Sequence, residues 1–290
     1  MIRALAYAAM MAVPVLVAYP AFAQTTVPQA NPSSPSPRPS EPPAPADLCS
    51  SGIGAIVTRP TQTTSVCVVK PNHVLVETGY QTETVKAPGP PYTFQSVPNA
   101  EIRVGTELRN VEIDVFPPNS LRSAGVTALA DVAAGVKWQI ASTPTFAYGV
   151  NVNGTAPTGS NPLTNPSGLG SANFGTATYN VNVQGVLGSV FGYGGTLSEN
   201  DLVVPTGRRY SSFVPSLSLS MSLPQSTSLF AEVARFTNAG GPGTPTRTQY
   251  IVGVTRDVRA RMQLDVETGF SPTAATGKYR YLAAGASYYF

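Results

Sequence analysis

Residues 261–270 read Arg-Met-Gln-Leu-Asp-Val-Glu-Thr-Gly-Phe, and this stretch decides the fold class. Its apolar and polar residues alternate. One parity holds Met262, Leu264, Val266 and Phe270, and the other holds Gln263, Asp265, Glu267 and Gly269. Because successive side chains of a β-strand point to opposite faces, the stretch predicts a strand with one apolar and one polar face.

The same alternation recurs along the chain, in residues 131–140, 179–184 and 214–223. The polar parity holds mainly Ser, Asn, Gln and Gly with scattered carboxylates, whereas the outer face of a soluble sandwich would be mainly charged. A transmembrane barrel has this texture, with apolar residues toward lipid and polar residues toward the lumen. Such a barrel must close, because each unpaired backbone group in hydrocarbon costs several kcal/mol.

The composition of the 290-residue chain agrees with this prediction. Only 11% of the residues are charged, against about 25% in a typical soluble domain. Beyond the N-terminus, the sequence contains no apolar run long enough for a membrane-spanning helix, which excludes a polytopic helical protein. The formal net charge of +3 supplies no concentrated basic face, so we expect no nucleic-acid partner.

The N-terminal region predicts export. Residues 1–23 combine a basic start, a short apolar run and the small-residue site Ala21-Phe22-Ala23, which is typical of a cleaved signal peptide. A retained membrane anchor is the alternative, but Pro14 and Pro20 interrupt the run. Residues 24–48 follow as a Pro-rich disordered linker that favours extended polyproline II, with a proline-motif ligand as the alternative.

Cys49 and Cys67 are the only cysteines in the chain. After export both lie in an oxidising compartment, so we expect one disulfide between them. Residues 49–72 are therefore interpreted as a short, disulfide-closed periplasmic segment that precedes a barrel of residues 73–290. A lone cysteine pair makes no metal site, and redox catalysis would favour a closer C-x-x-C pair.

The sequence predicts about twelve antiparallel strands, with ten or fourteen as alternatives. The expected strands are 73–84, 92–105, 108–117, 126–141, 144–155, 172–186, 189–198, 208–223, 227–238, 246–256, 260–271 and 278–290. Short connectors follow the even-numbered strands, the last of them at residues 257–259, and longer connectors follow odd-numbered strands. This pattern is typical of outer-membrane barrels with periplasmic termini and extracellular long loops.

The last residues form an alternating strand that ends in an aromatic side chain. Tyr288 and Phe290 share its apolar face. This ending looks like the C-terminal signature by which the barrel assembly machinery recognises bacterial outer-membrane barrels.

A family resemblance rests on a hairpin and three short motifs of the sequence. Residues 101–115 form a strand hairpin, Ala130-Asp131 and Gly135-Val-Lys-Trp follow, and Ala156-Pro-Thr-Gly closes the series. In this order they resemble the outer-membrane family named for the meta-pathway of phenol degradation, many of whose members are described as transporters. That family has Gly-x-Gly-Asp, Gly-x-Lys-Tyr and Leu-Pro-Thr-Gly at these places, so all three motifs are altered here. The resemblance implies a channel or transporter for small solutes, with aromatic compounds as one candidate class.

Strand parity also predicts the residues that line the lumen. The inward candidates are Glu77, Glu101, Arg103, Glu112, Asp114, Asp131, Lys137, Glu232, Asp265 and Glu267. Rings of charge of this kind set ion selectivity in pores, and an acidic interior favours cations. The alternative is that these side chains bind one another and close the lumen, since side chains nearly fill small barrels.

Basic residues gather in the predicted outer loops and outer strand ends. Arg208, Arg209, Lys278 and Arg280 are the candidates for contact with lipopolysaccharide phosphates. Plain solvation of the loops is the alternative explanation.

We expect no enzyme and no cofactor. His73 is the only histidine, no G-x-S-x-G motif occurs, and there is no His/Cys cluster for a metal. Two functions remain, both in the outer membrane: a channel or transporter for small solutes, or a closed structural barrel whose loops or Pro-rich tail bind a partner.

Overall fold

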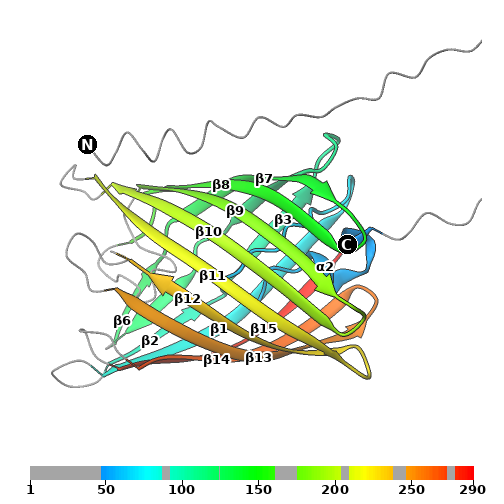
Figure 1. Cartoon of the computed structure of the whole chain (residues 1–290). Helices are drawn as coiled ribbons and strands as arrows, with labels where there is room; N and C mark the ends of the chain where they lie inside the picture. Colours follow the sequence, from blue (N-terminus) through cyan, green and yellow to red (C-terminus); the bar gives the residue numbers. More distant parts are fainter. Residues whose placement is uncertain are drawn as a thin grey trace, which may run out of the picture. The chain divides into compact units, whose positions relative to one another are not determined.

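A single antiparallel sheet closes on itself to form a barrel in the structure, a computed structural model (Figure 1). The structure describes residues 47–86, 92–123, 125–160, 175–203, 209–237, 246–272 and 278–290. The predicted signal peptide and all but the last two residues of the predicted linker lie outside these residues. Closure joins β1 (Val74–Lys86) to β15 (Lys278–Tyr289) along their full lengths.

Three barrel strands are each interrupted near the middle. Their halves are β2 (Tyr92–Val97) with β3 (Glu101–Gly105), β4 (Val111–Phe116) with β5 (Ser120–Ser123), and β6 (Val126–Leu129) with β7 (Val132–Ser142). Pro98 interrupts the first and Pro117-Pro118 the second, because proline has no N–H to donate to the sheet. The fifteen segments therefore make twelve barrel strands, which confirms the predicted number.

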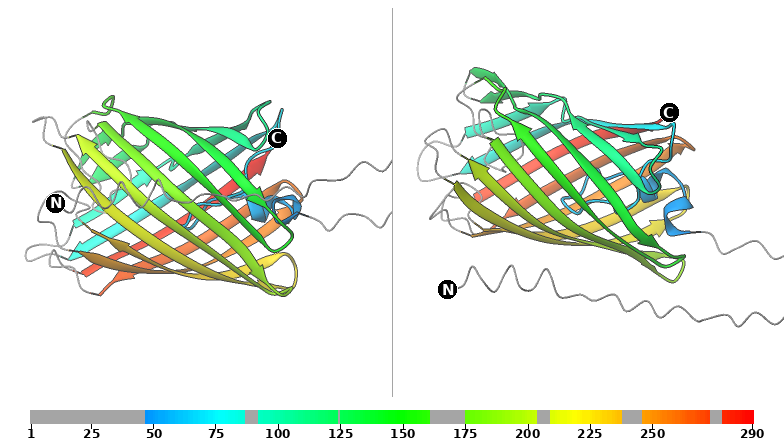
Figure 2. Two further views of the ribbon diagram at one scale, coloured as in Figure 1. Left: turned by 45° about the horizontal axis from the view of Figure 1, so that its top comes forward. Right: turned by 90° about the horizontal axis from the view of Figure 1, so that it is seen from above.

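The remaining strands follow one another around the wall as simple hairpins (Figure 2). They are β8 (Phe146–Ala156), β9 (Gly175–Leu187), β10 (Phe191–Val203), β11 (Arg209–Leu223), β12 (Thr227–Phe236), β13 (Arg247–Arg259) and β14 (Met262–Ser271). One end of the barrel carries the turns at 106–110, 143–145, 188–190, 224–226 and 260–261 together with Phe290, and we call it the short-turn end. The opposite end is the long-loop end.

Several predicted strand limits differ from the structure. The third strand runs over 111–123 instead of 108–117, the seventh over 191–203 instead of 189–198, and the turn expected at 257–259 lies at 260–261. The polar end of β10 stays in the sheet because its backbone pairs with both neighbours, as Asn200 does with Thr178 and Ser212. Backbone pairing extends a strand beyond the part of the sequence that alternates.

The two faces of the wall separate apolar from polar side chains. In β14, the even-numbered residues from Leu264 to Phe270 are exposed on the outside, and the odd-numbered residues from Gln263 to Ser271 are buried inside. Exposed apolar side chains recur on the outside of many other strands, among them Val136, Val181, Leu217, Leu219, Val252 and Leu282. The outside is thus an apolar belt, and the interior is polar.

Residues 47–73 lie inside the short-turn end of the barrel (Figure 2), and we call them the plug. They contain the 3-10 helix η1 (Leu48–Ser50) and the short helix α2 (Ile53–Ile56). Ile53, Ile56 and Val57 pack with Leu75 at the start of β1. No periodicity in this part of the sequence indicates that the segment turns into the barrel. Within the described ranges, no helix is long and apolar enough to cross a membrane.

Candidate functional site

A buried arginine is the centre of the interior on the β1–β4 side. The Arg103 guanidinium donates to Glu77 Oε1 at 3.0 Å and, through Nε, to Glu112 Oε1 at 2.9 Å. It also donates to the carbonyl oxygen of Cys67 in the plug at 2.8 Å. All three charged side chains are fully buried. Arg103 therefore joins two strands of the wall to the plug.

The neighbouring strands add further charges to this cluster. Lys137 Nζ of β7 lies 2.9 Å from Glu112 Oε1, and Asp114 Oδ1 lies 4.0 Å from Arg103 Nε. Glu101 opposes Glu77 across the β1–β3 pair, so their carboxylates share the same region. The cluster thus contains four carboxylates and two basic groups, and the plug backbone supplies additional donors.

The same carboxylates hold the plug by its backbone amides. Glu77 accepts from Thr58 N at 3.1 Å and from Arg59 N at 2.8 Å. Glu112 accepts from Val69 N at 2.6 Å. Each carboxylate therefore binds both Arg103 and the plug, which removes the cost of leaving a buried charge without partners.

On the opposite wall a single carboxylate takes this role. Glu232 of β12 accepts from Gln62 N at 2.8 Å and from both N and Oγ1 of Thr63 at 2.6 Å. Neutral side chains continue the contact: Thr196 accepts from Thr64 N at 2.8 Å, and Gln184 accepts from Val66 N at 3.1 Å. Residues 58–69 consequently run around the inside of the barrel and contact strands on all sides of it.

One further ion pair links the plug to the region where the barrel closes. Arg59 Nη2 donates to Asp265 Oδ1 of β14 at 3.3 Å, and the Asp265 side chain is fully buried. Sequence analysis did not select Arg59, because the plug sequence has no periodicity that would place it in a barrel.

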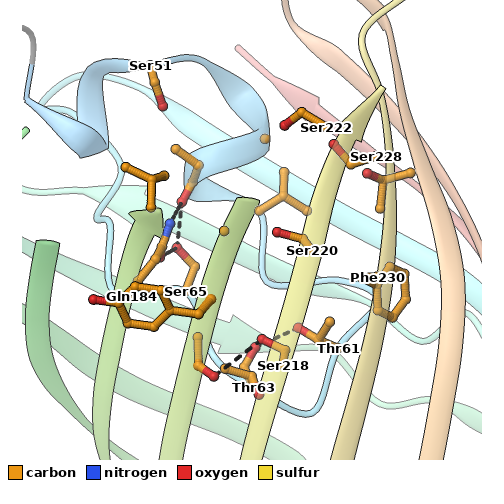
Figure 3. Close-up of a pocket in the computed structure, with 18 of the residues that line it drawn as sticks. Ser51, Thr61, Thr63, Ser65, Gln184, Ser218, Ser220, Ser222, Ser228 and Phe230 are labelled. Carbon is orange, nitrogen blue, oxygen red and sulfur yellow. Dashed lines mark hydrogen bonds between the residues drawn. The ribbon is translucent and has the colours of Figure 1, made fainter. Parts of the chain in front are cut away.

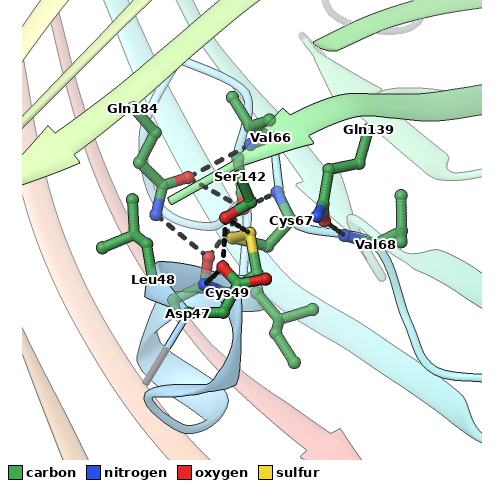
Figure 4. Close-up of a disulfide and its surroundings, with 12 residues drawn as sticks. Asp47, Leu48, Cys49, Val66, Cys67, Val68, Gln139, Ser142 and Gln184 are labelled. Carbon is green, nitrogen blue, oxygen red and sulfur yellow. Dashed lines mark hydrogen bonds between the residues drawn. A yellow bond between two sulfur atoms is a disulfide. The ribbon is translucent and has the colours of Figure 1, made fainter. Parts of the chain in front are cut away.

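The disulfide expected from the sequence joins the two arms of the plug (Figure 4). Next to Cys49, the plug contacts the β7–β8 turn: Leu48 N donates a hydrogen bond to Thr143 O at 3.0 Å. Cys67 is fully buried beside the Arg103 cluster. The Asp47 carboxylate accepts from Ser142 at the end of β7, next to this turn. Residues 49–67 are therefore a covalently closed loop inside the barrel.

A cavity of about 420 Å³ lies between the plug and the wall (Figure 3). Ser218, Ser220, Ser222 and Ser228 line it on the wall, and Ser51, Thr61, Thr63 and Ser65 line it on the plug. Figure 3 shows Ser51 at one end of this space and Thr61 and Thr63 at the other. Phe230 is an aromatic ring on its wall. The cavity is thus a hydroxyl-rich space whose far end is formed by residues of the plug.

Buried aromatic side chains extend along the interior from the cavity toward the long-loop end. Phe230, Ile251, Tyr279 and Tyr281 form one buried cluster. The Arg247 guanidinium lies 4.6 Å from the ring centre of Phe236 and 4.7 Å from that of Tyr279, at the long-loop end of their strands. Aromatic rings therefore share the lumen with carboxylates, and Tyr281 is the cross-strand partner of Glu83.

The structure places all ten lumen candidates on the inward parity of their strands. Nine are buried, and Glu101 is half-buried. Glu77, Glu101, Arg103, Glu112, Asp114 and Lys137 come together in one cluster, whereas Glu232 and Asp265 contact the plug separately. Asp131 lies apart from them and accepts from Gly159 N at 2.6 Å. Glu267 is buried on β14, one inward position from Asp265.

The candidates on the outside lie as follows. Lys278 and Arg280 are exposed at the long-loop end of β15, Arg208 lies outside the described residues, and the side chain of Arg209 is not described. Tyr288 and Phe290 expose their rings on the outer face, with ring centres 4.6 Å apart. Among the described residues, no group of three or more His, Cys, Asp or Glu side chains could hold a metal ion.

Solved structures of outer-membrane proteins share the barrel fold. The structure is similar to the crystal structure of an outer membrane channel from Pseudomonas putida F1, with a TM-score of 0.62 and 14% identity over 80% of this chain and 100% of that chain. A KdgM porin in complex with disordered oligogalacturonate has a TM-score of 0.48 and 7% identity over 73% of this chain and 98% of that chain. A NanC porin has a TM-score of 0.48 and 8% identity over 74% of this chain and 98% of that chain.

No protein-family model and no curated protein matches the sequence. The likeness to the Pseudomonas channel establishes the barrel fold. The resemblance to the family named for phenol degradation stays a prediction.

Proposed function

We propose that this chain is a bacterial outer-membrane channel for small solutes, with the short-turn end and the plug on the periplasmic side. One observation carries the proposal: a closed barrel whose outside is an apolar belt encloses a polar interior with a cavity of about 420 Å³. A wall of this kind is stable in lipid, because its strands pair their backbones around the closed barrel and apolar side chains meet the hydrocarbon.

The interior charges indicate cations as the favoured ions. Inward carboxylates outnumber basic groups in the described residues: Glu77, Glu83, Glu101, Glu112, Asp114, Asp131, Glu232, Asp265 and Glu267 stand against Arg59, Arg103, Lys137 and Arg247. An excess of negative charge lowers the energy of a cation in the lumen and raises that of an anion.

We further propose that the channel admits aromatic solutes. The family resemblance implies them, and the interior rings of Phe230, Phe236, Tyr279 and Tyr281 support it, since aromatic pairs prefer stacked or edge-to-face contact. A solute such as phenol would meet Phe236, Tyr279 and Tyr281 toward the long-loop end and Phe230 in the cavity.

Ion conductance of the folded protein in planar bilayers tests the proposal. We expect a small conductance. In a salt gradient, the sign of the reversal potential should show that cations pass more readily than anions. Liposome swelling with phenol and with glucose then tests the preference for aromatic solutes. A protein that shifts its gel mobility on boiling, as a folded barrel does, and yet passes no current would contradict the channel.

The plug supports a second candidate, a closed structural barrel whose loops or Pro-rich tail bind a partner. Residues 58–69 contact β1, β4, β9, β10 and β12 through hydrogen bonds, so this segment lies across the lumen. Absence of current in every condition, together with retention of a periplasmic or surface partner, is the result that favours this function.

With the short-turn end on the periplasmic side, the long-loop end faces the cell surface. We infer that Lys278 and Arg280, exposed near the long-loop end, contact lipopolysaccharide phosphates, and that Tyr288 and Phe290 are read by the barrel assembly machinery. Arg122 and Arg235, also exposed and on strands that end there, extend the basic rim.

A further inference from the structure

Residues 61–65 of the plug form one end of the cavity at the short-turn end. Thr61, Thr63, Thr64 and Ser65 all line the cavity. In Figure 3, Thr61 and Thr63 lie at the end of the cavity opposite Ser51. A solute that crosses the barrel along β10–β12 must therefore pass this segment.

The segment is attached to the wall by wall side chains and not by the β-ladder. Among the described residues, no backbone–backbone hydrogen bond joins residues 58–69 to a barrel strand. Glu232 accepts three bonds from Gln62 and Thr63, and the other contacts of 61–65 are hydroxyl or amide groups such as Thr196 and Gln184. Release of the segment would leave every strand pairing of the barrel intact.

The two arms of the plug are held more firmly than this middle part. Arg103 binds the carbonyl oxygen of Cys67 and, through Nη1, the carbonyl oxygen of Ile56. The Cys49–Cys67 disulfide then joins the arms covalently. Because the arms are fixed, a movement of 61–65 away from the wall is a local displacement toward the cavity and α2.

We propose that residues 61–65 are a gate that Glu232 latches, and that their release from Glu232 connects the cavity with the interior beyond it. The inference rests on the proposed channel function and concerns the regulation of that channel. The Glu232 carboxylate is the dominant contact, because hydrogen bonds to a charged group are stronger than those between neutral groups.

Bilayer recordings of the full chain test the latch. Glu232→Ala removes all three contacts, and we expect the open probability to rise about tenfold, the factor that the loss of charge-assisted bonds implies. Glu232→Gln keeps one acceptor oxygen and should give an intermediate value. Glu107→Ala is the control, because it also removes a carboxylate, but from an exposed turn of the short-turn end and outside the lumen. It should leave the open probability unchanged.

A disulfide that fixes residues 61–65 to the wall should have the opposite effect and keep the gate closed. Thr63 Oγ1 and Ser216 Oγ lie 3.1 Å apart, so the double variant Thr63→Cys, Ser216→Cys can form a disulfide between gate and wall. We expect the locked protein to lose its openings and to regain them on reduction. The natural protein under the same reductant, and each single cysteine variant, are the controls.

The outcomes separate the gate from the channel itself. If the natural protein conducts and both Glu232→Ala and the lock leave its openings unchanged, the gate is wrong and the channel stands. If folded, heat-modifiable protein carries no current in any variant, the proposed function is wrong and the gate with it.

Discussion

Gly79 of β1 and Gly285 of β15 are cross-strand partners at the place where the barrel closes, and together they leave the space that the Arg59 side chain occupies. A Cβ on Gly79 would lie 2.5 Å from Arg59 Nη2, and one on Gly285 would lie 2.5 Å from Arg59 Nε. The closure of the wall and the position of the plug therefore depend on the same pair of residues.

Gly285→Ala should displace Arg59 and break its ion pair with Asp265, because the added methyl group and the guanidinium cannot share the space. We expect a loss of about 1–3 kcal/mol, typical of overpacking, seen as a lower urea midpoint of the gel-mobility shift. Gly154→Ala is the control, since the nearest atom to its Cβ is 4.0 Å away. Equal midpoints for the two variants would contradict the proposed fit.

Arg103→Met should destabilise the protein by about 3–5 kcal/mol, because it leaves Glu77 and Glu112 buried without their cation. Arg103→Lys should recover only part of this loss, since one ammonium group cannot reproduce the guanidinium fork. Urea unfolding followed by the fluorescence of Trp138, the only tryptophan, measures the effect. Arg109→Ala, in an exposed turn, should change the midpoint little. A Met variant as stable as the Arg109 variant would show that the cluster does not need its cation.

Leu217→Arg should cost about 2–4 kcal/mol in lipid, because Leu217 is 51% exposed on the apolar belt near the middle of β11. Leu187→Arg introduces the same side chain at the short-turn end, where Leu187 is 62% exposed, and should cost only about 0–1 kcal/mol. Equilibrium unfolding from lipid vesicles compares the two. A reversed order would contradict the placement of the belt in the membrane.

Lys278→Ala with Arg280→Ala should weaken the binding of lipopolysaccharide to the folded barrel, because two exposed cations leave the long-loop end. Arg256→Ala with Arg259→Ala removes the same charge from exposed positions toward the short-turn end and should leave binding unchanged. Co-purification of lipopolysaccharide, quantified by its phosphate, is the measurement. Equal losses in both pairs would indicate a nonspecific effect of charge.

Local alternation was sufficient to predict the wall. In residues 261–270 the side-chain period of two is independent of distant contacts, so parity alone placed Asp265 and Glu267 inside. The same argument placed Arg103 and Lys137 on the face of the carboxylates that they bind. Parity could not predict that the third barrel strand is interrupted at Pro117-Pro118 and continues as β5.

The position of the plug was decided only by the tertiary structure. Residues 58–69 lack periodicity, and their partners are distant in sequence: Glu232 lies 170 residues from Gln62, and Asp265 lies 206 residues from Arg59. Such contacts exist only once the barrel has closed and its inward carboxylates face a common space. The sequence by itself determined which side chains face inward, because that property is local. Closure determined what those side chains bind, because it alone brings the N-terminal segment within reach of all the strands.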